Sequence, residues 1–227
     1  MQTTYGQYCP VAKASEVIAE RWTPLIVREL VLGSQRFNDL ERGLPHISRS
    51  LLASRLRQLE RAGVVERRVE ADSQRVGYYL TQAGQELEPI ITQLGVWGQR
   101  WANRDIVPDD LDPRLLTWDM RRRIYRERLP ERRISVQIDF TGARQESIWM
   151  LLEPSDVTVC LTNPGFDLDL LITADTVALH RVWIGRLSFG VAVRDGLITL
   201  QGARDVVRGF PHWLALSSFA SIPSARE

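Results

Sequence analysis

Arginine is concentrated in the segment 48–61, where four arginines accompany a single acidic residue, Glu60. A guanidinium group presents a planar fork of N–H donors that fits phosphate oxygens and the edge of guanine. Leu52, Leu56 and Leu59 recur at helical spacing in the same segment, so a helix there buries one face and leaves most of the arginines outside it. The segment therefore has the residue types and spacing of a helix that binds nucleic acid. The alternative interpretation is a surface helix whose arginines are only solvated.

The side chains that we expect to contact DNA lie on or near the non-core side of this helix. Ser48 stands where it caps the helix and would also meet a phosphate. Arg75 is placed at the tip of a following hairpin, where it would contact the DNA backbone. The complete set of predicted DNA-binding residues is Arg36, Ser48, Arg49, Ser50, Ser54, Arg57 and Arg75.

Short helices and a hairpin are expected to position this segment. Thr23-Pro24 predicts an N-cap followed by the first residue of a helix that ends at Gly33. A short helix at 37–42 and the turn Pro45-His46-Ile47 then lead into the arginine-rich helix. Two strands, 64–69 and 76–80, follow with a turn between them. This order is typical of a winged helix-turn-helix, in which one helix enters the major groove.

Residues 8–101 also resemble the HxlR family of bacterial transcription regulators, which is similar to the MarR type. The resemblance implies a dimeric winged helix that binds a palindromic operator in double-stranded DNA, often as a repressor. Two departures fall in the arginine-rich helix: Arg49 and Ser50 replace a proline and a basic residue, and Ala53 replaces a common hydroxyl. The resemblance rests on Cys9-Pro10-Val11, Arg21-Trp22-Thr23, Leu25-Ile26, Arg28-Glu29-Leu30, Gly33, Arg36-Phe37, Asp39-Leu40, Ile47-Ser48, Arg55-Leu56, Leu59-Glu60, Gly63-Val64-Val65, Tyr78, Leu80-Thr81 and Gly84.

A homodimer is predicted through the N-terminal helix and a long helix that Thr81 caps and that ends at Trp101. The broad apolar stripe of this last helix, which includes Ile90, Leu94 and Trp97, is more than a small wing can cover. Two-fold operators require two reading helices about one turn of DNA apart.

Cys9 is a redox candidate because it matches an N-terminal cysteine that some members of the resembled family use to sense thiol-reactive compounds. Lys13 lies one helical turn further on, where its charge would favour the thiolate. The alternative, which we prefer, is a structural thiol under the dimer interface. Cys160 lies in a predicted strand and is expected to belong to the core.

The 227 residues are enough for one large domain or two small ones. A stretch with two prolines and four aspartates, 103–113, predicts a boundary. We expect a DNA-binding domain at 1–104, a linker at 105–114 and a second domain at 115–227. By count the segments 1–107, 108–133 and 134–227 carry net charges of +2, +2 and −3, which sum to the +1 of the whole chain. Lys13 is the only lysine among 29 basic residues, which fits either codon bias or phosphate recognition.

Composition excludes several other classes of protein. The chain lacks an apolar run long enough to span a membrane and a secretory start, so we expect a cytoplasmic protein without a membrane partner. Two cysteines and three scattered histidines predict no metal site, and we expect no cofactor. Aspartate, histidine and serine occur in no recognisable catalytic arrangement, so an enzyme is the weakest hypothesis.

The second half predicts strands first and helices later, so the fold class expected for the chain is α+β. The strands are expected at 134–140, 148–152, 157–161, 168–173 and 197–200, and helices at 115–124, 175–183, 189–194 and 203–216. Seven arginines at 121–133 suggest either a second nucleic-acid surface or, as we prefer, a solvated helix end.

Residues 115–219 resemble the sterol carrier protein-like fold through Ile172-Thr173-Ala174-Asp175, Trp183 with Gly185, and the run 195–202. The resemblance implies a sheet and helices that enclose a site for an apolar ligand. We expect an uncharged or amphiphilic small molecule near Trp149, Trp183, Phe189 and Trp213; each aromatic taken alone is more often ordinary core. The leading hypothesis is thus a DNA-binding regulator with a ligand-sensing second domain. The runner-up is a lipid or acyl-ligand carrier whose winged helix serves dimerisation or protein contacts.

Overall fold

The computed structural model describes residues 4–70, 74–102, 106–107 and 110–225. The chain divides into two compact units, Met1–Gly95 and Val96–Glu227. This division precedes the segment 105–114 in which the sequence predicts a linker, and residues 103–105 and 108–109 of that region are outside the described part. Among the described residues, no helix is both long and apolar enough to cross a membrane.

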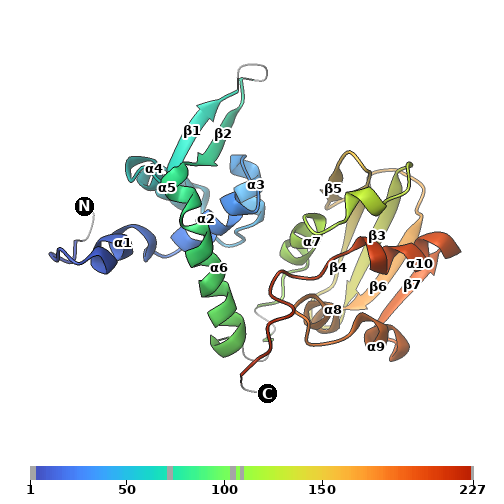
Figure 1. Cartoon of the computed structure of the whole chain (residues 1–227). Helices are drawn as coiled ribbons and strands as arrows, with labels where there is room; N and C mark the ends of the chain where they lie inside the picture. Colours follow the sequence, from blue (N-terminus) through green and yellow to red (C-terminus); the bar gives the residue numbers. More distant parts are fainter. Residues whose placement is uncertain (1–3, 71–73, 103–105, 108–109, 226–227) are drawn as a thin grey trace. The chain divides into compact units, whose positions relative to one another are not determined.

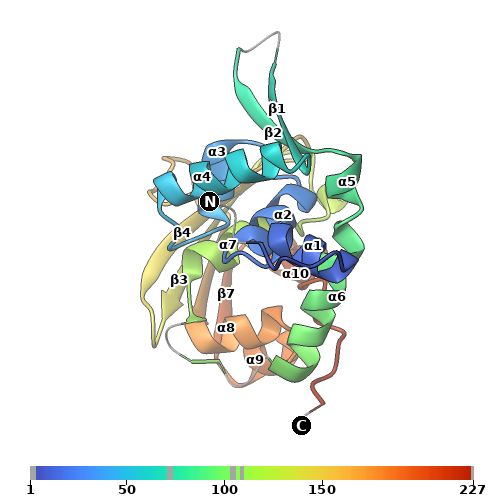
Figure 2. The same cartoon turned by 90° about the vertical axis from the view of Figure 1, so that its left-hand side faces the viewer.

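The first unit is a small helical domain with one hairpin, and its arginine-rich helix is α4 (Figure 1). The hairpin β1–β2 is antiparallel, with Arg67 opposite Tyr78. In both Figure 1 and Figure 2, α3 and α4 lie at the end of the unit from which this hairpin projects. The elements are α1 (Pro10–Ile18), α2 (Thr23–Val31), α3 (Phe37–Arg42), α4 (Arg49–Arg61), β1 (Val65–Val69), β2 (Val76–Leu80), α5 (Gln82–Gln85) and α6 (Glu88–Trp97).

Two local predictions for this unit are wrong. Thr23 is the first helical residue of α2 and not its cap; the cap position belongs to Trp22, which adopts a left-handed conformation with φ 78°. The long helix expected after Thr81 is divided into α5 and α6. Pro89 explains the division, because proline disfavours helical geometry in the residue before it and is best accommodated in a first turn.

A buried carboxylate holds α2 to the end of α3. The side chain of Glu29 is inaccessible to solvent, accepts a hydrogen bond of 2.8 Å from Arg28 Nη2 and another of 3.1 Å from Ser34 Oγ. Arg28 Nη2 also donates to the carbonyl oxygen of Gly43, at 3.0 Å. A buried carboxylate is tolerated only when its hydrogen-bonding capacity is used, and these contacts use it.

Gly43 is the residue that makes room for this carboxylate. A Cβ atom at position 43 would stand 1.9 Å from Glu29 Oε2, far inside any real contact distance. The φ angle of Gly43 is −78°, so the backbone itself does not demand glycine. The turn between α3 and α4 therefore starts from a position fixed by packing against Glu29.

The second unit is a five-stranded mixed sheet with the strand order β5-β4-β3-β6-β7. β3 and β6 are parallel, and the other neighbouring pairs are antiparallel. The elements are η1 (Gly98–Ala102), α7 (Pro113–Arg121), a 3₁₀ turn (Arg126–Arg128), β3 (Ile134–Thr141), β4 (Glu146–Leu152), β5 (Val157–Cys160), β6 (Leu170–Asp175), α8 (Thr176–Trp183), α9 (Phe189–Arg194), β7 (Ile198–Gly202) and α10 (Arg204–Trp213). The predicted strands and helices are all present, with ends that differ by a few residues, so the α+β class is confirmed.

The core of this unit lies between one face of the sheet and the helices α7 to α10. Ile138 and Ile172 point from the centre of the sheet into this core, together with Leu179 of α8 and Phe210 of α10. Successive strand residues point to opposite faces. Trp149 therefore lies on the other face of the sheet, where it is opposite Cys160 in the ladder and is partly exposed.

Two further expectations need correction. Cys160 is not a core residue, because Val157 and Val159, on the other face of β5, are the members of the strand that pack in the core. The arginines at 121–133 form neither a free basic surface nor a simple solvated helix end. Several of them bind backbone carbonyl groups of distant segments: Arg121 Nε donates to Val157, at 2.6 Å, and Arg128 Nη1 donates to His212, at 3.1 Å.

The Glu29–Gly43 contact predicts a specific non-additive effect on stability. Gly43→Ala should lower the free energy of unfolding by about 1–3 kcal/mol, because the new methyl group collides with a buried carboxylate. In a Glu29→Ala background the same change should cost less, since the colliding group is gone. Urea unfolding followed by circular dichroism measures both values. Gly190→Ala, whose Cβ meets only open space and Ser188 Oγ at 3.8 Å, is the control. Equal costs in the two backgrounds would show that Glu29 does not restrict position 43.

Candidate functional site

The geometry at the start of α4 brings its N-terminus to the surface. His46, in the turn after α3, has a left-handed backbone with φ 75° and is exposed. Ser48 follows as the predicted N-cap, and its Oγ accepts a hydrogen bond of 3.2 Å from the backbone N–H of Leu51. The cap satisfies one of the free N–H groups at this end of the helix, and the helix dipole gives the remaining ones an affinity for anions.

Burial divides α4 into two faces as its sequence predicts. Leu52, Leu56 and Leu59 are buried. The expected contact residues lie on the opposite side with different degrees of exposure. Arg49, Ser50 and Arg57 are exposed, and Ser54 is partly buried.

The two predicted reading arginines differ in their present partners. Arg49 Nη1 pairs with Glu41, and its guanidinium lies 5.0 Å from the centre of the Phe37 ring. Arg57, in contrast, has no hydrogen bond or ion pair with any residue in the described part of the chain. Arg55 turns away from this face and pairs with Glu20, at 2.8 Å. The guanidinium of Arg57 is thus available for a contact with DNA, whereas Arg49 would first have to break its ion pair with Glu41.

Arg36 is held within the protein by a residue at the tip end of the hairpin, directly after β1. Its guanidinium pairs with Glu70, which also accepts a hydrogen bond of 3.0 Å from the hydroxyl of Tyr79. The hydrogen bond to Glu70 raises the pKa of Tyr79 above its usual value, with a further contribution from burial. The same carboxylate raises the pKa of Arg36. Arg36 therefore fixes the hairpin relative to α3, and its contact with DNA stays a prediction.

The hairpin carries exposed arginines besides Arg75, which is the one that the sequence predicts to contact DNA. Arg75 is exposed close to the tip, next to residues 71–73, which are outside the described part. Arg67 in β1 and Arg61 at the end of α4 are also exposed. Strand alternation gave no signal for Arg67, because it shares the face of buried Val65; burial instead decreases steadily along β1 after Val65. Together these side chains extend the positive charge from α4 to the hairpin.

Cys9 stands at the N-cap position of α1 and is partly buried. The ammonium group of Lys13, one turn away, is bound by Glu16 at 3.1 Å. Its charge is therefore directed to a carboxylate and not to the thiol. This arrangement removes the specific electrostatic argument that the sequence offered for a reactive cysteine.

A row of exposed apolar side chains runs along α6 and continues into η1. Ile90, Leu94, Trp97 and Trp101 are 49%, 54%, 58% and 45% exposed, at positions that share one helical face. In α1, Val11 is also highly exposed. Exposed apolar groups at regular helical spacing commonly mark a surface that another protein covers.

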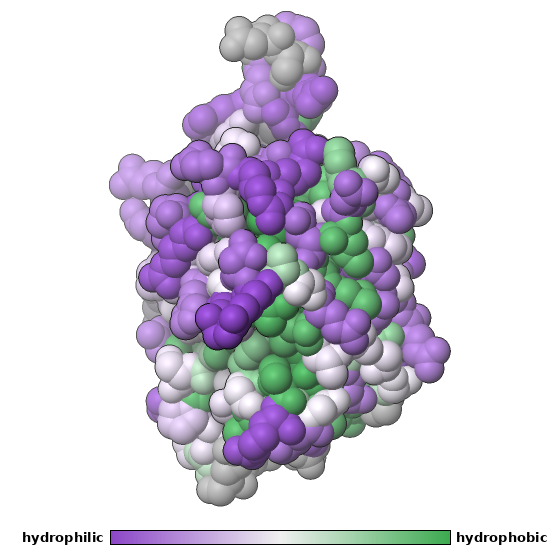
Figure 3. Space-filling view, turned by 90° about the vertical axis from the view of Figure 1, so that its right-hand side faces the viewer, coloured by the Kyte–Doolittle hydropathy of each residue, from purple (hydrophilic) through white to green (hydrophobic). Residues whose placement is uncertain are grey.

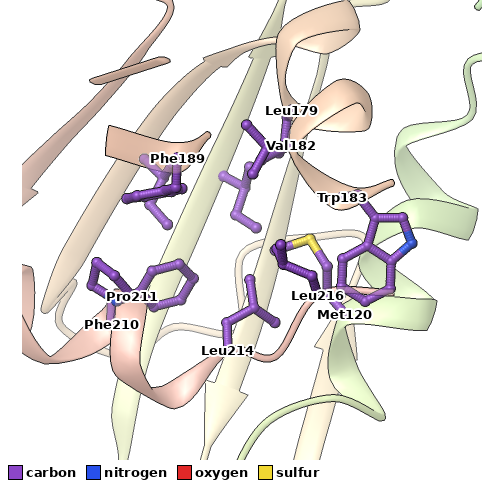
Figure 4. Close-up of a pocket in the computed structure, with 11 residues that line it drawn as sticks. Met120, Leu179, Val182, Trp183, Phe189, Phe210, Pro211, Leu214 and Leu216 are labelled. Atoms are coloured by element: carbon purple, nitrogen blue, oxygen red, sulfur yellow. The ribbon is translucent and has the colours of Figure 1, made fainter. Parts of the chain in front are cut away.

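An apolar cavity of about 180 Å³ lies in the second unit. Figure 4 shows its walls: Phe189 and Phe210 lie on one side, and Trp183 lies on the other with Met120 beside it. Leu216 also contributes to the wall. Of the four residues predicted to contact a ligand, Trp183 and Phe189 are therefore in the wall.

The other two predicted ligand contacts are elsewhere. Trp213 is buried in the core, and Trp149 is on the opposite face of the sheet. Neither belongs to the residues that enclose the cavity. Within the described residues, no group of three or more histidine, cysteine or acidic side chains is arranged to hold a metal ion.

Comparison with known proteins identifies a family that matches most of the first unit and the start of the second. Residues 17–106 match the family described as HxlR-like helix-turn-helix. An uncharacterised HTH-type transcriptional regulator of Bacillus subtilis, YvaP, is 40% identical over 98 residues, which cover 42% of this chain and 91% of that protein. The HTH-type transcriptional regulator YodB of the same organism is 34% identical over 104 residues, covering 45% of this chain and 89% of YodB.

A protein of known structure is also similar in sequence. The redox regulator HypR in its oxidised form is 37% identical and covers 43% of this chain and 100% of its own, with a TM-score of 0.40. The family match covers the helix-turn-helix part of the chain.

Proposed function

The chain belongs to the HxlR family of helix-turn-helix transcriptional regulators, and from this premise we propose that it represses transcription as a homodimer that binds a palindromic operator. The observation that carries the proposal is the exposed arginine-bearing face of α4. Membership of the family accounts for DNA binding, whereas the dimer, the repression and the regulated second unit are the further parts of the proposal.

We assign the reading of base edges to α4. Its N-terminus is exposed and capped by Ser48, and small side chains at Ser50 and Ala53 allow close approach to a groove. Arg57 is long enough to reach a guanine edge or a phosphate and need not give up any described partner. Arg49 must break its ion pair with Glu41, which costs at most about 1 kcal/mol for exposed groups.

We place the dimer interface on the apolar face of α6 and on α1. Ile90 and Leu94 supply exposed apolar area, and Val11 adds more from α1. Covering such area gains roughly 25 cal/mol for each Å² removed from water. A dimer built this way presents two copies of α4 to the two halves of a palindrome.

The second unit is proposed to be the regulatory part and to have a sterol carrier protein-like fold. The support is its mixed sheet, covered on one face by helices, and the apolar cavity between them. A ligand there changes DNA affinity only if it favours one state of the chain over another. The same cavity is the observation that favours the alternative function, an apolar-ligand carrier.

Arg57→Ala should weaken binding to the DNA upstream of the chain's own gene by about 1–3 kcal/mol and relax sequence preference at one position. Arg49→Ala should weaken DNA binding by less than Arg57→Ala does. In the unaltered chain, the loss of the Arg49–Glu41 ion pair offsets part of the free energy that Arg49 gains from its contact with DNA. Arg75→Ala should lower the slope of log affinity against log salt by about one unit, as expected for a lost phosphate contact. Fluorescence anisotropy at several salt concentrations measures all three.

The control is Arg144→Ala, which removes an exposed arginine from the turn between β3 and β4. It should leave operator affinity unchanged. If neither Arg49→Ala nor Arg57→Ala alters affinity, α4 is not the reading helix. Weak binding of the unaltered chain with no sequence preference would favour the carrier function.

Leu94→Glu should convert the dimer to a monomer, because it places a charge in the centre of the apolar face of α6. Sedimentation velocity at micromolar concentration reports the change. Leu168→Glu is the matched control, since Leu168 is similarly exposed but belongs to the second unit. A monomer formed by the unaltered chain would contradict the proposed interface.

For Cys9 we propose a structural thiol near the dimer interface and not a sensor. Its support is the pairing of Lys13 with Glu16. Diamide treatment should therefore leave operator affinity within about twofold of the untreated value. Release of the operator in the unaltered chain, together with retention in Cys9→Ser, would show that Cys9 senses oxidants.

A further inference from the structure

The cavity of the second unit is built almost entirely from hydrocarbon. Ile138 and Ile172 of the sheet form part of its wall, and Phe210 lies beside them. The wall contains no ionisable side chain, and the indole N–H of Trp183 is the only side-chain hydrogen-bond donor among its residues. An ionic ligand would lose its hydration without a partner there, which is strongly unfavourable.

The volume of the cavity sets the size of its ligand. About 180 Å³ is close to the size of engineered apolar cavities, about 150 Å³, that stay dry and bind benzene. The space fits one aromatic ring or a compact aliphatic molecule and is too small for a sterol or a long acyl chain. The chemistry of the wall and the volume thus point to the same narrow class of ligand.

The opening of the cavity lies beside the end of α10 and the segment that follows it. Pro211 and Leu216 belong to the wall and are exposed, so they form its rim. The segment that carries Leu216 is held at both sides: the backbone N–H of Ala215 donates to Arg123 O, at 2.9 Å, and that of Ser217 donates to Trp183 O, at 3.1 Å. Figure 3 shows apolar side chains gathered near the centre of one face over the second unit, within a polar surround.

Trp183 connects the cavity to the chain that leads from the DNA-binding unit. The carbonyl oxygen of its neighbour Ile184 accepts a hydrogen bond of 3.3 Å from Gln99 Nε2. Gln99 is buried and lies in η1, directly after α6. The backbone N–H of Ala225, in the terminal segment, donates to Arg100 O in the same turn, at 3.0 Å. A ligand that displaces Trp183 or the rim segment thus acts on groups that hold η1.

We propose that the cavity binds an uncharged one-ring aromatic or similarly compact apolar molecule, and that its occupancy is transmitted to η1 through Trp183, Ile184 and Gln99. The binding site stands on the cavity alone. Its regulatory part rests on the proposed function as a DNA-binding regulator.

Fluorobenzene is the probe, and 4-fluorobenzoate is its charged counterpart; ¹⁹F NMR follows the binding of both to the full chain. Fluorobenzene should bind saturably with a Kd on the order of 0.1–1 mM, a reasonable range for so few atoms. The benzoate should bind at least tenfold more weakly. Leu216→Trp should weaken fluorobenzene at least tenfold by filling the rim, and Leu161→Trp, at an exposed site away from the cavity, should not.

Operator affinity is then measured by anisotropy with and without saturating fluorobenzene. The unaltered chain should show a change of at least threefold, and Leu216→Trp should show none. Gln99→Leu should bind fluorobenzene normally but lose the effect on DNA. Retention of the effect in Gln99→Leu would overturn the route through Gln99.

The outcomes separate this inference from the proposed function. Absence of saturable fluorobenzene binding, or equal binding of 4-fluorobenzoate, overturns the ligand site even if the operator is bound tightly. Saturable binding with unchanged operator affinity overturns the regulatory part. Saturable binding by a chain that does not bind DNA supports the site and contradicts the proposed function.

Discussion

The buried carboxylate of Glu29 is the constraint on which the geometry of the first unit depends. It has no contact with solvent, so Arg28 and Ser34 must supply its hydrogen bonds, and Gly43 must leave room for it. The contacts involve three places in the chain: α2, the residues just after it, and the end of α3. The turn that leads to α4 therefore begins at a fixed point, and the direction of α4 follows from it.

Along α4, apolar side chains attach the helix to the core, and charged side chains form ion pairs or remain exposed. Leu52 and Leu56 attach the helix to the core, while Ser48 closes its exposed end. Intramolecular ion pairs occupy Arg36 and Arg49 and hold neighbouring elements together. Exposed arginines at the end of α4 and in the hairpin then provide charge for a polyanion. Stability and recognition thus use the same residue type at different positions.

Local sequence was sufficient to predict most of the helices and strands, but not the residues that they contact. The limits of α4 and its cap could be predicted because leucine spacing and a capping serine act within a few residues. The pairing of Arg36 with Glu70 could not, because it joins positions 34 apart in the chain. Likewise, the sequence showed which aromatic residues the second unit contains, but it did not show which of them line the same cavity. Trp183 reaches the cavity from α8, whereas Trp149 falls on the other face of its strand.

Dimethyl sulfate footprinting of the DNA upstream of the chain's own gene tests most directly whether α4 reads the major groove. The reagent methylates guanine N7, which is exposed in that groove and is the atom an arginine would cover. The account predicts two symmetric clusters of protected guanines with centres about 10–10.5 base pairs apart, or a multiple of that distance. Arg57→Ala should lose protection at one guanine in each cluster. Full occupancy of the DNA without any protected guanine N7, or a pattern that Arg57→Ala leaves unchanged, would contradict it.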